Sequence, residues 1–354
     1  MRIMVGGRVI RQWRIVLARA LVVALISGGG CARFGAERLA QAPNTYPAIL
    51  SPPPRLVVDF GTVSLTNLPT RWAYVGPEPA RLRYRIVEPR DYRVSSALEQ
   101  EVVKGRTRSR MIFRATLPGG VTPQTADPHG TVVLLHGYGL DQSMMVPWAL
   151  TLAEAGWRCV LLDLRGHGRS TGRRIHFGTV EAGDLRQLLD DLDRRGWLRP
   201  PVMAMGESYG ASLALRWMAQ DHRVRTVVAM APYPELATAA ENLRAEYVPW
   251  FPRRWLAGAL RRLPEVLRVA PGELDPIRAV AGAPVRALFV AGGQDHIAPP
   301  ADVERFRMAS APGSRLWVVP EAGHEALPHF LPELVGPVLE WLTESANPVV
   351  ADHE

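Results

Sequence analysis

The chain has 354 residues, of which 47% are apolar, and its formal net charge is +8 at neutral pH. This length and apolar content suit one large globular domain or two ordinary ones. Five arginines lie within residues 1–30, which contain no acidic residue, so the rest of the chain carries a net charge of only +3. A body so weakly basic argues against a nucleic acid as the partner.

Residues 1–30 have the features of a targeting signal. An arginine-rich stretch leads to the apolar run at residues 20–26, then to small residues and Cys31. This order is typical of secretory signals, and the apolar run is too short to cross a bilayer as a helix. Small residues before a cysteine also resemble the lipobox of bacterial lipoproteins, although Gly28 stands where that motif has a branched aliphatic residue. We therefore expect an extracytoplasmic lipoprotein anchored through lipidated Cys31; cleaved secretion, an uncleaved anchor and a misassigned start codon are the alternatives.

Residues 31–105 form a Pro-rich extension with short strand-like pieces such as residues 82–87. They predict a tether, a small accessory layer, or both. From residue 106 to about 345, apolar runs alternate with amphipathic stretches. Such alternation is typical of an α/β domain with a mostly parallel sheet and helices on both faces. Residues 346–354 are expected to be a C-terminal tail.

The apolar runs are short and continuous, as expected for strands that are buried on both faces. We expect strands at residues 131–135, 160–162, 202–205, 224–230, 285–290 and 316–319. Amphipathic patterns predict helices at residues 144–153, 180–192, 211–218 and 332–342. Between the fourth and fifth of these strands, residues 234–280 are rich in alanine, arginine and aromatic residues and predict a cap of two or three short helices.

The pattern Gly-x-Ser-x-Gly occurs twice, around Ser170 and around Ser208. In a nucleophile elbow this pattern needs a strand directly before it and a helix directly after it. Ser208 has the expected strand 202–205 before it and the expected helix 211–218 after it. Ser170 lies in a turn-rich loop and is followed by two arginines. The context therefore favours Ser208 as a nucleophile and gives Ser170 a structural role.

A serine nucleophile needs a base, and the base needs an orienting acid. Among the nine histidines, His324 follows the last expected strand and its turn, at the sheet edge where active sites collect. Asp295 follows the preceding strand, in a turn where an aspartate commonly only caps the backbone. The order Ser208, Asp295, His324 is the order of the triad in this fold type. We expect these three residues to form a catalytic triad, with no metal and no cofactor.

Backbone amides are expected to complete the site. One donor of an oxyanion hole belongs to the residue after the nucleophile, here Tyr209, and the second to the loop after an earlier strand. His136-Gly137-Tyr138-Gly139 occupies that loop, so Tyr138 is the expected second donor. Only the amides are needed, so the tyrosine rings need no catalytic role and can simply form walls of the site. Glu207, beside the nucleophile, has no role that its position in the sequence explains.

Taken together, these motifs resemble an α/β-hydrolase over residues 107–345. They are His136-Gly137-Tyr138-Gly139, Leu162-Asp163-Leu164-Arg165-Gly166-His167-Gly168-Arg169-Ser170-Thr171-Gly172, Gly206-Glu207-Ser208-Tyr209-Gly210, Gly293-Gln294-Asp295 and Ala322-Gly323-His324. The resemblance is to the monoacylglycerol-lipase and lysophospholipase-like branch, which is grouped with serine aminopeptidases. It implies that the segment ending in Ser170 is a structural loop after a strand.

The resemblance implies a serine hydrolase that works through an acyl-enzyme. We expect a carboxylic ester substrate, such as a monoacylglycerol or lysolipid, with the N-terminus associated with a membrane. An amidase or aminopeptidase, an acyltransferase with the same triad, and a non-catalytic surface module are the alternatives. Three aromatic residues of the cap are expected either to form an acyl-binding wall or to pack the cap on the core: Trp250, Phe251 and Trp255.

Overall fold

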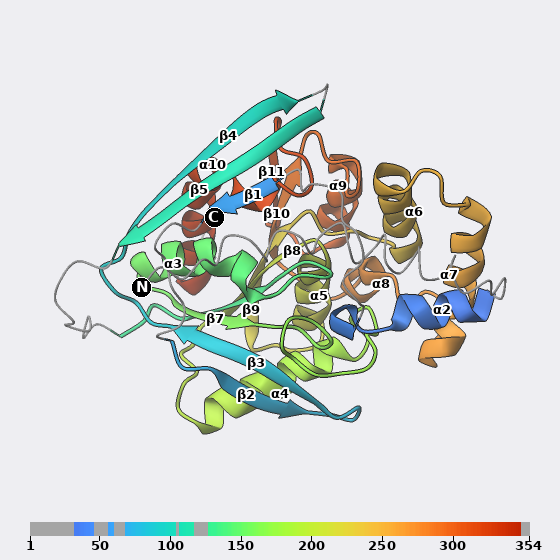
Figure 1. The fold of residues 1–354 in the computed structure, drawn as a ribbon. Coiled ribbons are helices and arrows are strands. Elements are labelled where there is room, and N and C mark those ends of the chain that lie inside the picture. The colour runs from blue at the N-terminus through green and yellow to red at the C-terminus, as the bar shows by residue number, and fades with distance from the viewer. Residues whose placement is uncertain (1–31, 46–55, 60–67, 104–105, 117–126, 348–354) are drawn as a thin grey trace.

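The structure, a computed structural model, describes residues 32–45, 56–59, 68–103, 106–116 and 127–347. The expected signal segment 1–30, Cys31 and residues 348–354 of the expected tail lie outside this range. Within it, the chain forms an α/β fold with a central sheet between two layers of helices (Figure 1). The strands are β1 (Leu56–Asp59), β2 (Arg71–Val75), β3 (Ala80–Val87), β4 (Arg93–Val103), β5 (Arg106–Thr116), β6 (Thr131–Leu135), β7 (Arg158–Leu162), β8 (Val202–Glu207), β9 (Val224–Met230), β10 (Ala287–Gly292) and β11 (Arg315–Val319).

The helices follow the strands in alternation, as the sequence predicts. The α-helices are α2 (Ala32–Ala40), α3 (Val146–Glu154), α4 (Glu181–Arg194), α5 (Tyr209–Met218), α6 (Leu236–Tyr247), α7 (Arg253–Leu267), α8 (Pro276–Val280), α9 (Pro300–Ala309) and α10 (Leu331–Ala346). Short 3-10 helices cover Pro43–Thr45, Gln142–Met145 and Leu327–His329. The ends of α3, α4 and α5 lie within three residues of the ends that the sequence predicts. Helix α10 continues about one turn beyond its predicted end at residue 342.

Eight of the described strands form one sheet in the order β11-β10-β9-β8-β6-β7-β3-β2. From β11 to β7 all neighbours are parallel, whereas β3 is antiparallel to both β7 and β2. This confirms the expected fold class. Because the parallel strands end at the same edge, the residues that follow β8, β10 and β11 are brought together there.

The two faces of the sheet are covered by separate apolar clusters. On β6, Val133 and Leu135 join the cluster that contains residues of α4 and α5, while Val132 and Leu134 join the cluster that contains residues of α3 and α10. Alternate side chains of a strand point to opposite faces, so a continuous apolar run is what a doubly covered strand requires. All five residues of β6 are accordingly buried.

The sheet starts earlier in the chain than the boundary at residue 106 that we expected. Two strands of the expected extension belong to the central sheet: β3 pairs with β7, and β2 pairs with β3 at the edge of the sheet. Arg81, Arg83 and Arg85 interrupt the apolar pattern of β3, which is why the run looks weak in the sequence. The last two of these have polar partners. Arg83 lies 3.3 Å from the Asp163 carboxylate, and Arg85 donates to the Gln142 side chain at 2.9 Å. Both charges thus gain polar partners at the sheet.

The remaining part of the expected extension forms a long antiparallel hairpin. β4 and β5 pair along their full length, and β1 runs parallel to β5 in the same small sheet. Met111 and Phe113 of β5 are fully buried in the cluster that contains α3 and α10. The hairpin therefore covers the outer side of these helices (Figure 1). None of the described helices has both the length and the hydrophobicity that a membrane crossing requires.

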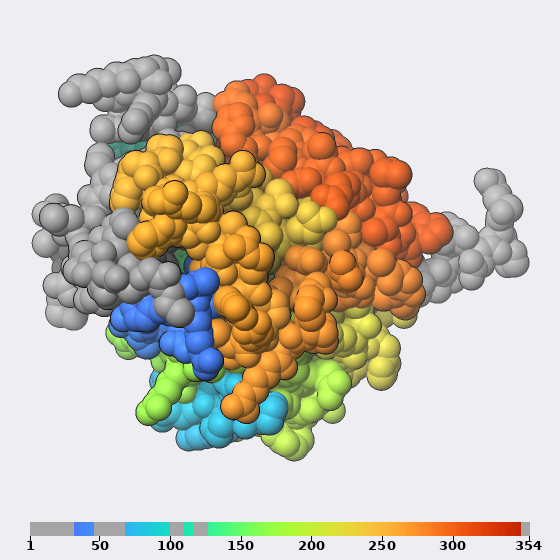
Figure 2. All heavy atoms as spheres, turned by 90° about the vertical axis from the view of Figure 1, so that its right-hand side faces the viewer, coloured from blue at the N-terminus to red at the C-terminus, as the bar shows by residue number. Residues whose placement is uncertain are grey.

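The cap lies between β9 and β10 and consists of α6, α7 and α8. It agrees with the helices expected at residues 234–280. Helix α2, from the N-terminal side of the chain, packs against α7 (Figure 2). The two helices approach closely, because a Cβ atom on Gly35 would lie 2.9 Å from the Cβ of Ala259.

Residues 40–45 attach this end of the chain to the body. Ile175 donates its amide to the Ala40 carbonyl at 2.9 Å, and the amides of Ala42 and Asn44 donate to the carbonyls of Arg173 and Gly166 at 3.0 Å. These carbonyls belong to the loop that follows β7. Helix α2 is thus fixed to the cap on one side and, through residues 40–45, to the body on the other.

Candidate active site

Ser208 lies in the sharp turn between β8 and α5. Its backbone has φ +49° and ψ −112°, a conformation that a residue with a side chain adopts only at a cost of about 1–3 kcal/mol. The turn is held by the Ser208 amide, which donates to the Met230 carbonyl at the end of β9 at 2.8 Å. This strand, strained turn and helix are the arrangement that presents a serine hydroxyl at a sheet edge.

The two glycines of the motif are required by close backbone contacts. A Cβ atom on Gly206 would lie 2.5 Å from backbone atoms of Gly210, and one on Gly210 would overlap the backbone at Leu135 and His136. Neither position can hold a side chain without moving a strand or a helix. The sequence pattern around Ser208 therefore follows from packing as well as from chemistry.

His324 joins the serine to an aspartate. Its Nε2 atom lies 3.0 Å from Ser208 Oγ, and its Nδ1 atom lies 2.8 Å from Asp295 Oδ2. The other oxygen of Asp295 accepts the amides of Ile297 and Ala298 at 2.8 and 2.9 Å. Asp295 is fully buried and satisfied, so it can hold His324 in the tautomer that leaves Nε2 free to accept the serine proton.

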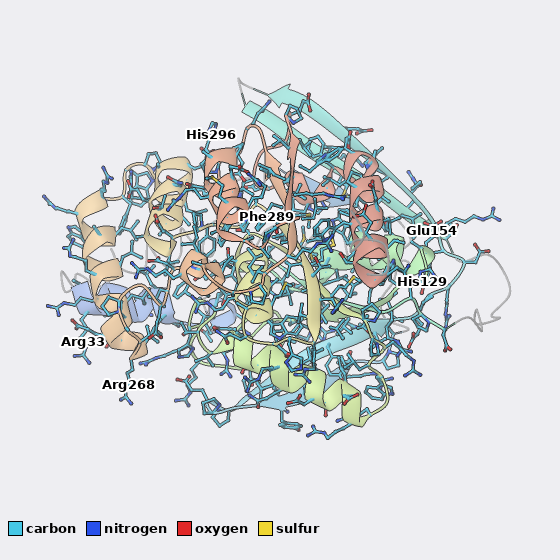
Figure 3. The ribbon with its side chains drawn as sticks, turned by 180° about the vertical axis from the view of Figure 1, so that it is seen from behind. Arg33, His129, Glu154, Arg268, Phe289 and His296 are labelled. Carbon is cyan, nitrogen blue, oxygen red and sulfur yellow. The ribbon has the colours of Figure 1, made fainter. Side chains whose placement is uncertain are left out.

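Opposing effects act on the pKa of His324. Burial lowers it most strongly, but the charge and hydrogen bond of the Asp295 carboxylate raise it, and the net result is a raised pKa. Glu325 and Glu207 add to this increase. The neighbouring His296 is exposed and points away from the body (Figure 3), so it takes no part in this chain of contacts.

The loop after β6 is fixed from two sides. Buried His136 donates from Nδ1 to the Gly137 carbonyl at 2.8 Å, and its Nε2 accepts the Leu164 amide at 3.0 Å. Burial lowers the pKa of His136, which keeps the ring neutral and able to accept. From the other side, Glu207 Oε1 accepts the Gly137 amide at 3.1 Å.

Glu207 thus has a partner that the sequence does not reveal. Its side chain connects the end of β8 to the loop that carries Tyr138. The second oxygen, Oε2, is buried and has no hydrogen-bond partner among the described residues. Burial raises the pKa of Glu207 to about 7, so the carboxyl group changes its charge near neutral pH beside the proposed nucleophile.

The rings of Tyr138 and Tyr209 lie beside the loop and the elbow. Their centroids are 6.1 Å apart in an edge-to-face arrangement, and the buried His167 ring stacks on Tyr209 at 5.8 Å. Such offset and edge-to-face contacts stabilise aromatic clusters. Tyr209 is the first residue of α5, so its amide is at the helix N-terminus, where negative charge is favoured. The rings of Tyr138, Tyr209 and His167 therefore pack together in one aromatic cluster.

Ser170 occupies a structural position. Its hydroxyl donates to the Asp163 carbonyl at 2.6 Å and accepts the Arg83 amide at 2.8 Å. The residue is buried, and these bonds join the loop after β7 to β3. The second Gly-x-Ser-x-Gly pattern is therefore part of a connection in the sheet.

The cap touches both loops that carry the histidine and the aspartate. Tyr247, the last residue of α6, donates its hydroxyl to Glu325, which adjoins His324. Asn242, also on α6, donates to the carbonyl of Ile297 at 3.0 Å, two residues beyond Asp295. Sequence reasoning missed both contacts, since nothing in a helical pattern identifies partners 50 or more residues away.

The three aromatic residues of the cap occupy different environments. Trp250 is 60% exposed and Trp255 is 37% exposed, while Phe251 is buried in a small cluster with Val248 and Leu256. Phe251 therefore packs against other residues of the cap. This differs slightly from the expected alternative, in which the aromatic residues pack the cap on the core. The acyl-binding role of these residues stays a prediction. In the part of the chain that the structure describes, no three His, Cys, Asp or Glu side chains gather as metal ligands.

Comparison with known proteins places this chain in a family. Residues 126–277 match the family model described as serine aminopeptidase, S33. An uncharacterized protein of Mycobacterium tuberculosis is 32% identical over 234 residues, which are 65% of this chain and 76% of that protein. A monoacylglycerol lipase of Mycolicibacterium smegmatis is 31% identical over 194 residues, 48% of this chain and 65% of the lipase.

Solved structures agree on the fold. An esterase of Pyrococcus furiosus superposes with a TM-score of 0.57 at 18% sequence identity, covering 80% of this chain and 97% of the esterase. The fold and the strand–turn–helix around Ser208 define an α/β-hydrolase. Within that class, the chain belongs to the serine aminopeptidase S33 family, whose relatives include a monoacylglycerol lipase.

Proposed function

We propose that this protein is a serine hydrolase that cleaves carboxylic esters through an acyl-enzyme on Ser208. The observation that carries the proposal is the continuous hydrogen-bonded series from Ser208 through His324 to Asp295, with distances of 3.0 and 2.8 Å. A hydroxyl group in such contact with a neutral imidazole can lose its proton as it attacks a carbonyl carbon. Asp295 then stabilises the imidazolium that forms.

The reaction follows from these positions. Ser208 Oγ bonds to the acyl carbon while His324 takes its proton, and the tetrahedral oxyanion is bound by the amides of Tyr138 and Tyr209. His324 gives the proton to the departing alcohol, and water then releases the acid by the same steps in reverse order. Removing one such amide donor costs on the order of 3 kcal/mol in the barrier.

For the substrate we propose an ester with an apolar acyl chain, such as a monoacylglycerol or a lysolipid. Support comes from the relative that is a monoacylglycerol lipase and from the fold shared with an esterase. The family description as a serine aminopeptidase favours amide hydrolysis as a second candidate. Parallel assays on ester and amide chromogens with the same acyl group distinguish the two.

Labelling with a fluorophosphonate probe tests the mechanism. Wild-type protein should label, Ser208→Ala should not, and Ser170→Ala should label if it remains folded, which a melting curve establishes. Lack of labelling in wild type, or equal labelling of Ser208→Ala, would refute the mechanism.

We further propose that the protein is anchored at an extracytoplasmic membrane surface, through lipid on Cys31. The proposal is supported by the order of arginines, apolar run, small residues and cysteine in the sequence. Mass spectrometry of the mature N-terminus tests it. A lipid-modified Cys31 is the expected result, and an intact Met1 would exclude it.

A further inference from the structure

Three exposed arginines, Arg254, Arg261 and Arg268, form what we call the arginine stripe of α7. Arg254 and Arg261 lie seven residues apart on one side of the helix, about 10 Å apart at 1.5 Å per residue. Arg268 directly follows the last helical residue, Leu267, in a left-handed conformation. The other arginines of α7 are paired, Arg253 with Glu241 and Arg262 with Glu265.

The stripe is not neutralised by the protein. Among the described residues, no acidic side chain forms an ion pair with any of its three arginines. Helix α2, which packs against the same helix, adds exposed Arg33, which is paired with Glu37 at 3.3 Å. Figure 3 shows Arg33 and Arg268 extending outward at the same end of the molecule. The exposed, unpaired charge of the stripe itself attracts anionic surfaces.

An exposed aromatic residue accompanies the charge. Trp250 lies three residues before Arg253, where α7 begins, is 60% exposed, and contacts only Phe251 among the described aromatic rings. Tryptophan beside arginine is the combination found where proteins meet the headgroup region of a bilayer, because the ring has an apolar body and a polar edge.

The position of α2 gives an independent constraint. The apolar run at residues 20–26 ends six residues before Ala32, where α2 begins. Six residues span at most about 20 Å even when fully extended. If residues before α2 are held at a membrane, α2 and the adjoining α7 must lie close to it. The covalent tether therefore leads to the end of the molecule that carries the stripe.

From these observations we propose that the face formed by α2, Trp250 and the arginine stripe of α7 docks on anionic phospholipid at a bilayer surface. This inference rests on the proposed membrane location of the protein. Arginine heads would contact phosphate groups while Trp250 enters the headgroup region. The cap, which contacts the loops of Asp295 and His324, would then face the lipid phase from which an apolar ester is taken up.

Quenching of tryptophan fluorescence by lipids with brominated acyl chains tests the docking. The full-length chain is mixed with vesicles of phosphatidylcholine alone or of phosphatidylcholine with phosphatidylglycerol. We expect stronger quenching with phosphatidylglycerol, and a loss of that extra quenching in Trp250→Phe. Trp317→Phe is the matched control, since Trp317 is 45% exposed on the edge strand β11. Equal quenching in both vesicle types, or unchanged quenching in Trp250→Phe, would overturn the proposal.

The charge requirement is tested by a triple variant, Arg254→Gln/Arg261→Gln/Arg268→Gln. Each arginine near an anionic surface contributes about fivefold to binding, so the docked population should fall by tenfold or more. A control with the same change in charge, at the exposed residues Arg186, Arg194 and Arg225, should dock like wild type. Equal docking of the two triple variants would contradict a specific face. Ser208→Ala should dock like wild type, because docking does not use the serine. Failure of the proposed chemistry would therefore appear in the labelling assay alone, and failure of docking in the vesicle assay alone.

Discussion

Replacing Glu207 by glutamine should change how the stability of the protein depends on pH. Burial raises the pKa of Glu207 from its ordinary value of 4.5 to about 7. Between these values the folded protein keeps a proton that the unfolded chain has released. Stability conferred by this group is thus fully present below pH 4.5 and is lost as the pH rises through 7, since the unfolded state binds fewer protons.

The size of the effect follows from the shift. A shift of about 2.5 pKa units corresponds to roughly 3 kcal/mol of unfolding free energy, at 1.36 kcal/mol per unit. Glu207→Gln carries no titrating proton, so its stability relative to wild type should increase by about this amount between pH 4.5 and a pH above 7. Urea denaturation of both proteins across this range measures the difference. Parallel stability curves for the two proteins would refute the reasoning, and Glu154→Gln, at an exposed glutamate of α3, is the control.

The same position tests the support of the loop after β6. Glutamine keeps an oxygen that can accept the Gly137 amide, whereas Glu207→Ala leaves that buried amide without its partner. An unsatisfied buried donor costs about 1–3 kcal/mol. We therefore expect fluorophosphonate labelling to be slowed more by alanine than by glutamine. Equal rates in the two variants would show that the loop does not depend on this hydrogen bond.

Three further predictions concern the triad and the cap. Asp295→Asn should reduce kcat for a chromogenic ester by about ten-thousand-fold, because His324 is no longer held in the tautomer whose Nε2 accepts the serine proton. The circular dichroism spectrum should change little. A loss below tenfold would contradict the role of Asp295 in orienting His324. Activity should fall on acidification through the pKa of His324, which lies above its ordinary value of 6.5, because the protonated ring cannot accept a proton; a pH–rate profile with its midpoint below 6.5 would be inconsistent. Tyr247→Phe should reduce kcat/KM without unfolding the protein, whereas Tyr74→Phe, at a tyrosine that is 76% exposed, should not; equal kinetics would show that the cap contact is dispensable.

Much of the parallel sheet can be predicted from the sequence because its signals are local. The run at β6 is apolar on both faces, and the elbow at Ser208 has its strand, glycines and helix within about 15 residues. The chain order of serine, aspartate and histidine then assigns them to strand ends at the same edge of the sheet. Each of these inferences needs only a short window of sequence and the geometry of parallel strands.

The features that escape prediction depend on distant partners. Arg83 makes β3 look like a poor strand until Asp163, from another strand end, is placed beside it. Glu207 has no evident role until the Gly137 amide, 70 residues earlier, is found at its carboxylate. Helix α2 has only nine residues, too few for stable helix in isolation, so its structure depends on α7.

The packing of α2 on α7 has a consequence for how the chain acquires its structure. Helix α2 is synthesised well before its partner α7, which begins only at Arg253. Until α7 has been made, the small residues of α2 have no surface to bury against, so this contact must form late, over a long separation in sequence. The cap and the first helix should accordingly mature as one unit, and truncation on either side should leave the other unfolded.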